Sequence, residues 1–129
     1  MNDVKVARWA RILLGLLTLV VLGFTLSAYP KPTMNPGLAA LTGEVAGLGS
    51  VAGGFLGRQL GLALIAAAGA ALGSRLAMLF GSFALLFFNL HDAVLMSLAG
   101  AGGIGAISGL ILAVLAGVVF FKSFSTRAA

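Results

Sequence analysis

Residues 51–73 of this chain read VAGGFLGRQLGLALIAAAGAALG. The stretch is long enough to cross a lipid bilayer, which takes about 20 predominantly apolar residues in a helix. Its two strongly polar residues are Arg58 and Gln59. A charge inside an apolar span is costly, so it usually faces a partner, the interior of a helix bundle or a water-filled cavity. This segment therefore predicts a membrane helix with a charge that has a structural or functional role.

Three further apolar segments of similar length accompany it, separated by short links. The four spans are expected at residues 9–29, 51–73, 76–98 and 104–121. Of the 129 residues, 60% are hydrophobic and 9% are charged, whereas soluble proteins average roughly 25% charged residues. The sequence predicts a single integral membrane domain, residues 1–129, folded as an all-α four-helix transmembrane bundle.

The link between the first two spans is rich in proline, and residues 29–36 read YPKPTMNP. Asn35 followed by Pro36 is typical of a helix N-cap with proline at the first helical position. A helix running unbroken from Pro36 to Gly73 would be about 55 Å long, which is too long for one crossing. A break is therefore expected near residues 47–49, and residues 36–50 are predicted to form an interfacial or re-entrant segment.

Basic residues gather on one side of this topology. If both termini are cytoplasmic, Lys31 lies outside and six others lie inside, namely Lys5, Arg8, Arg11, Arg75, Lys122 and Arg127. This follows the positive-inside rule and predicts a multi-pass protein of a bacterial inner (cytoplasmic) membrane. The basic start, the apolar residues 12–26 and the small residues Ser27 and Ala28 also resemble a secretory signal peptide. That alternative would leave three spans.

Arg58 and Asp92 are expected at the same depth in the membrane. Arg58 precedes Arg75 by 17 residues, and Asp92 follows it by 17. At the rise of an α-helix, both lie roughly 25 Å from the turn between their two helices. Two hypotheses remain open: an ion pair that fixes the register of the helices, and a polar site that opens to the outer face.

Other residues could belong to such a polar site. Asn89 shares a helix face with Asp92, whereas His91 lies about 100° away. Glu44 is either a cap for the arginine at the outer interface or a solvated carboxylate. Proton or cation handling by Asp92 with His91 is a further hypothesis, since such groups form relays in transporters. A metal site would need more ligands than His91, Asp92 and Glu44 provide, so no metal or other cofactor is predicted.

Small residues recur every four positions in the second and fourth spans. The packing residues predicted from this repeat are Gly49, Gly53, Gly57 and Gly61, and then Gly105, Gly109 and Gly117. Such ladders let helix backbones approach closely, which stabilises helix pairs in lipid. The helix that packs on each ladder belongs either to the same chain or to another subunit. The phenylalanines of the third span are predicted to fill the grooves beside these glycines; they are Phe80, Phe83, Phe87 and Phe88.

Residues 54–62, which read GFLGRQLGL, are followed by a short turn with Arg75 and by Asp92 late in the next span. This layout resembles small uncharacterised bacterial four-helix membrane proteins, families of unknown function that are DoxX-like in outline. The resemblance covers residues 9–121 in layout and Arg58, Gly61 and Asp92 in motif, and Gln59 stands where that pattern would have an acidic residue. It implies the four-helix fold and no specific activity.

The sequence contains no nucleophile–base constellation, phosphate loop, matched pair of carboxylates or haem-type histidine pair, so enzymatic activity is not expected. The topology explains the formal net charge of +5 better than nucleic-acid binding does. The first functional hypothesis is a non-enzymatic accessory or scaffold subunit that packs in the lipid bilayer, as a homo-oligomer or in a larger complex. The alternative is a small transporter or channel-like protein with a polar site around Arg58 and Asp92.

Overall fold

The computed structural model describes residues 4–42, 51–98, 100 and 103–126. In these ranges the chain forms helices: α1 (Arg8–Ser27), the short 3-10 helix η1 (Pro32–Met34), α2 (Pro36–Thr42), α3 (Val51–Leu72), α4 (Arg75–Leu98) and α5 (Ile104–Ser125). Four of them, α1, α3, α4 and α5, are long and apolar enough to cross a membrane. They indicate a multi-pass membrane protein, and they coincide closely with the four predicted spans.

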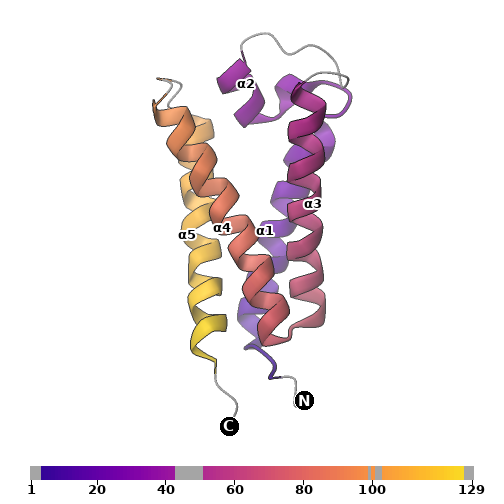
Figure 1. The fold of residues 1–129 in the computed structure, drawn as a ribbon, viewed down its shortest axis with the longest axis vertical. Coiled ribbons are helices and arrows are strands. Elements are labelled where there is room, and N and C mark those ends of the chain that lie inside the picture. The colour runs from indigo at the N-terminus through magenta and orange to yellow at the C-terminus, as the bar shows by residue number, and fades with distance from the viewer. Residues whose placement is uncertain (1–3, 43–50, 99, 101–102, 127–129) are drawn as a thin grey trace.

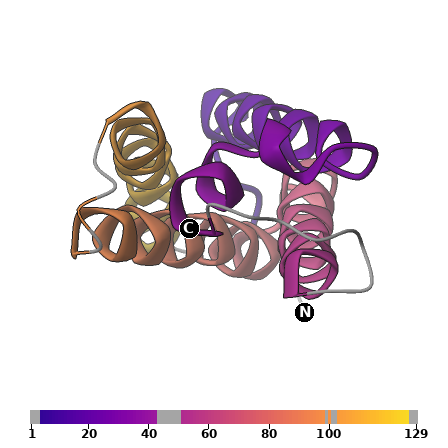
Figure 2. The same cartoon turned by 90° about the horizontal axis from the view of Figure 1, so that it is seen from above.

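Helices α1 and α3 stand together on one side and α5 stands on the other, while α4 crosses the bundle from beside α3 at its start to beside α5 at its end (Figure 1). At that far end α1 therefore pairs with α3, and α4 pairs with α5. The start of α1, the turn from α3 to α4 and the end of α5 all lie at one end of the bundle, which we call the termini end. The short helix α2 lies across the opposite end, over the space between the helix pairs (Figure 2). We call that the α2 end.

The core consists of the inward faces of the four long helices. Leu14 of α1, Leu85 of α4 and Val119 of α5 are among its fully buried side chains. Buried hydroxyl groups donate to the carbonyl oxygen one turn earlier in their own helix, as Thr18 Oγ1 does to Leu14 O at 2.8 Å. The hydroxyl groups are thereby satisfied without any partner from another helix, which suits an apolar interior.

Helices α3 and α4 approach each other closely at two glycines. A methyl group at Gly69 would lie 2.7 Å from Ala77 O, and one at Gly81 would lie 3.0 Å from Ala66 Cα. Because both neighbours are backbone atoms, the two helices would have to separate to admit a side chain. Neither glycine belongs to the predicted ladders, because the first ladder ends at Gly61 and the second begins at Gly105.

Two arginines at the termini end bind the last carbonyl groups of helices that are distant in the sequence. Arg11 donates to Ala70 O at 3.2 Å and to Ala71 O at 2.9 Å, near the end of α3. Arg75 donates at 3.3 and 3.2 Å to the carbonyl oxygens near the end of α5, those of Ser123 and Phe124. The last carbonyls of a helix have no partner within it and carry the negative end of its dipole. These arginines therefore cap helices as well as contributing charge.

The segment before α1 pairs with the turn between α3 and α4. Val6 N donates to Gly73 O at 3.0 Å, and Arg75 N donates to Val4 O at 2.8 Å. Gly73 has a φ of +64°, a conformation that glycine adopts without steric cost. A side chain at Gly73 would also occupy the space of the Arg11 guanidinium. Residues 4–7, α1 and the turn thus form one closely packed unit.

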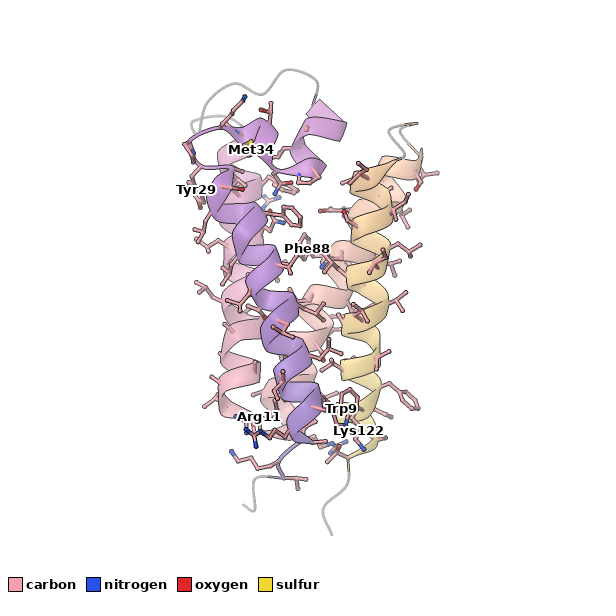
Figure 3. All side chains as sticks on the ribbon, turned by 180° about the vertical axis from the view of Figure 1, so that it is seen from behind. Trp9, Arg11, Tyr29, Met34, Phe88 and Lys122 are labelled. Atoms are coloured by element: carbon pink, nitrogen blue, oxygen red, sulfur yellow. The ribbon has the colours of Figure 1, made fainter. Side chains whose placement is uncertain are left out.

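The phenylalanines of α4 are distributed differently from the prediction. Phe80, Phe83 and Phe87 are exposed, so they do not fill grooves between helices of this chain. Phe88 is half-buried and lies between the helices, toward the α2 end (Figure 3). The face of α4 that packs on α3 carries small residues such as Gly81, and close helix contact leaves no room there for aromatic rings.

Candidate functional site

Polar side chains from several segments meet beneath α2. They line a small cavity of about 40 Å³, and they are Asn35, Gln59, Asn89, Asp92 and Ser108. The rest of its wall is largely apolar and includes Phe24 and Phe88. A polar space above roughly 10–15 Å³ is large enough to hold a water molecule. The cavity is therefore a place where a small polar species could lie inside the bundle.

Both ends of the Asn35 side-chain amide are bonded. Its Oδ1 accepts from the backbone N–H of Gly37 at 2.9 Å and of Leu38 at 3.3 Å, which caps the start of α2 as the sequence predicted. Its Nδ2 therefore points elsewhere and donates to Gln59 Oε1 at 2.8 Å. Gln59 Nε2 is left as the free end of the second amide, because no described residue accepts from it.

Asn89 and Asp92 occupy successive turns of α4. Asn89 Nδ2 donates to Leu85 O at 2.8 Å, so its Oδ1 is the free end, without a donor among the described residues. The Asp92 carboxylate lies 3.3 Å from His91 Nδ1. In the described part of the chain, every fully buried side-chain nitrogen or oxygen has a partner. The free atoms of Gln59 and Asn89 therefore keep accessible surface, and both residues line the cavity.

Arg58 does not join this cluster. It is exposed on α3, whereas the next residue, Gln59, is buried with 7% of its surface accessible. Between residues 51 and 98, which the structure describes, no ion pair joins Arg58 to Asp92, so the predicted pair is wrong. Adjacent residues of a helix point about 100° apart, and α3 is rotated so that Gln59 lines the cavity in place of the arginine.

His91 lies beside the cavity and does not line it. Its side chain is 53% exposed, against 15% for Asp92, and its ring stacks on Phe87 with the centroids 6.0 Å apart. Among the residues with described positions, no group of three or more His, Cys, Asp or Glu could hold a metal ion. Glu44 and Gly49, both candidates from the sequence, lie outside the described residues.

The two glycine ladders have different surroundings. In α5, a methyl group at Gly109 would lie 3.1 Å from Asn89 O, one at Gly105 would lie 3.0 Å from Met96 Sδ, and one at Gly117 would lie 3.7 Å from Leu86 Cδ1. In α3, Gly53 is partly exposed, while Gly57 and Gly61 are exposed, and a methyl group at either would have no atom of another described helix within 4 Å. The α5 ladder therefore contacts α4, whereas Gly57 and Gly61 contact no described helix of this chain.

Sequence reasoning missed three polar residues of the cavity, namely Asn35, Gln59 and Ser108. Asn35 was recognised only as a helix cap. Gln59 was not considered for the site, because the neighbouring charge of Arg58 was taken as the polar group of the span. A serine in an apolar helix usually bonds to its own backbone, as Ser108 Oγ does to Gly105 O at 3.0 Å, so its position gave no signal. Comparison of the chain with protein-family models, curated proteins and solved structures gives no match.

Proposed function

We propose that this protein is a non-enzymatic membrane subunit that assembles with a second copy of itself through the exposed face of α3. The proposal rests on a contrast between the exposed faces of the spans. Those of α1, α4 and α5 carry large apolar side chains, for example Leu19, Phe83 and Ile107. The exposed face of α3 carries glycine in its first half, at Gly54, Gly57 and Gly61.

A helix face lined by glycine packs better against another helix than against lipid acyl chains. Glycine has no side chain for acyl chains to pack against, whereas two small faces allow close contact between helix backbones. A parallel second copy presents the same glycines at the same depth. These properties support self-association along Gly54, Gly57 and Gly61.

Arg58 flanks this face and is compatible with such a contact. In a two-fold symmetric pair, equivalent residues at the edge of the interface lie on opposite sides of it, so the two arginines stay apart. The long aliphatic part of each arginine side chain can lie along the apolar surface while its guanidinium reaches toward lipid phosphate. Arg58 then stabilises the position of α3 in the membrane without a carboxylate partner.

The orientation that we propose places the termini end in the cytoplasm of a bacterial inner membrane. Arg11 and Lys122 lie at that end, and Tyr29 and Met34 lie at the α2 end (Figure 3). The positive-inside rule favours this orientation. Trp9 and Tyr29, near opposite ends of α1, suit the two interfaces of the bilayer, where aromatic residues are enriched.

Cross-linking through single cysteines tests the assembly, because the chain has no cysteine of its own. In native membranes under oxidising conditions, we expect Gly54→Cys and Gly57→Cys to give disulfide-linked dimers. The matched controls are Phe83→Cys and Val114→Cys, on the exposed faces of α4 and α5, which should stay monomeric. Adding Gly61→Leu to Gly57→Cys should abolish the dimer. Equal cross-linking at all four positions, or none at the α3 positions, would refute the proposal.

A further inference from the structure

The cavity beneath α2 contains the Asp92 carboxylate, and its described lining includes no basic side chain. His91 Nδ1 lies 3.3 Å from the carboxylate, beside the cavity, and its side chain is 53% exposed. A carboxylate in a membrane bundle is costly unless a positive charge, a proton or polar groups compensate it. The charge balance of the cavity therefore favours a positively charged guest.

The neutral groups around the carboxylate add oxygen acceptors. Asn89 is 5% exposed, and its Nδ2 is held by Leu85 O, so Oδ1 is the atom available to a guest. Ser108 uses its hydroxyl hydrogen on Gly105 O, which leaves lone pairs of its oxygen free. Carboxylate, amide and hydroxyl oxygens are ligands of hard cations rather than of thiophilic metals.

Gln59 supplies a donor to the same space. Its Oε1 is taken by Asn35 Nδ2, so the Nε2 group is oriented away from that bond. Gln59 and Asp92 share the lining of the cavity, and no hydrogen bond joins these two described residues. The Nε2 group can therefore donate to a water molecule that accompanies the ion.

Charge and size together select one class of ion. Among the described residues that line the cavity, Asp92 is the one carboxylate. It neutralises one positive charge, whereas a divalent ion would leave a net charge in a medium of low dielectric constant. The cavity of about 40 Å³ exceeds the roughly 10–15 Å³ that one water molecule requires, so it has room for a small ion. We infer that the cavity binds one monovalent cation, of the Na⁺ class, through Asp92, Asn89 and Ser108. This inference is independent of assembly through α3.

Sodium titration of the purified protein in lipid nanodiscs tests this site. Na⁺ replaces choline at constant ionic strength and pH, and the readouts are ²²Na⁺ binding and the thermal unfolding temperature. We expect saturable binding at one site per chain. Asp92→Asn keeps the shape of the side chain and removes its charge, and it should lower the affinity roughly tenfold or more. Ser97→Ala, on α4 but outside the cavity, is the matched control and should bind as the wild type does.

A gain-of-function variant keeps the inference testable if Asp92→Asn fails to fold. Asn89→Asp places two carboxylates in the cavity, so Ca²⁺ should raise the unfolding temperature of that variant and leave the wild type unchanged. Identical curves for Na⁺, K⁺ and choline with the wild type would overturn the inference. Saturation of the wild type by Ca²⁺ at the same concentrations as Na⁺, or undiminished binding by a folded Asp92→Asn protein, would overturn it as well.

Discussion

Asn35 and Gln59 are joined by a hydrogen bond of 2.8 Å between two buried side-chain amides, which ties the start of α2 to α3. Because Asn35 also caps α2, a single substitution removes both interactions. We expect Asn35→Ala to lower the free energy of unfolding by about 2 kcal/mol, measured by denaturation in mixed detergent micelles. Thr33→Ala, at an exposed position of the neighbouring helix η1, is the control. A cost for Thr33→Ala equal to that of Asn35→Ala would contradict the role of the bond.

Gly73 combines a positive φ with a side-chain space that Arg11 fills. Gly73→Ala should therefore cost the backbone strain, about 1 kcal/mol or more, together with displacement of the guanidinium from the end of α3. Gly100 is a matched control, because its φ is +68° and open space surrounds it. The difference in unfolding free energy between Gly73→Ala and Gly100→Ala isolates the arginine contact. No difference would show that Arg11 moves aside without cost.

Gly69 and Gly61 lie on the same helix in opposite surroundings. A methyl group at Gly69 meets the Ala77 carbonyl at 2.7 Å, while the position at Gly61 is open. Gly69→Ala should separate α3 from α4 and destabilise the bundle by about 1–3 kcal/mol. Gly61→Ala should instead stabilise the monomer by about 0.5–1 kcal/mol, because alanine is the better helix former. The unfolding free energies of both variants in detergent decide this, and a change of the same sign in both would be inconsistent with the rotation of α3.

Arg75 holds the end of α5 through two carbonyl oxygens. Arg75→Ala should cost about 1–2 kcal/mol, since it removes two hydrogen bonds and a favourable charge at the helix terminus. Arg8→Ala removes the same charge from an exposed position at the start of α1 and should change stability by less than about 0.5 kcal/mol. Hydrogen exchange at the last turn of α5 provides the local measurement. Equal exchange in the two variants would rule out the cap.

Arg58 and Asp92 should be energetically independent, because the two side chains form no ion pair. In a double-mutant cycle with Arg58→Leu and Asp92→Leu, we expect a coupling energy within roughly 0.5 kcal/mol of zero. A buried ion pair would instead give a large coupling, since the loss of one partner would leave the other charge uncompensated. A coupling of several kcal/mol would therefore restore the sequence-based hypothesis.

The number and extent of the long helices could be predicted because bilayer thickness imposes a length that hydrophobic runs reveal directly. The cap at Asn35 was equally predictable, since asparagine before proline has a local mechanism. The rotation of α3 could not be predicted. Its small residues occur on more than one side, with Gly61 exposed and Ala63 and Ala66 buried, so the repeat of glycines did not identify the buried face.

The candidate site was predictable in part for the same reason. Asn89 and Asp92 are one turn apart, and helix geometry alone puts them on one face. The cavity also needs Gln59 and Asn35, which come from segments far from α4 in the sequence. The two side chains reach the cavity because of the rotation of α3 about its axis and the position of α2. Both features depend on tertiary packing, which no local sequence pattern encodes.

The pairing of Val4 and Val6 with the turn at Gly73 and Arg75 has a consequence for biosynthesis. The first span leaves the ribosome before α3 exists, so neither its flanking segment nor Arg11 has a binding partner at that stage. The final position of α1 can be reached only after the α3–α4 hairpin has entered the bilayer. Docking of α1 is therefore expected to be a late step of assembly, with Val4 and Val6 among the last residues to become fixed.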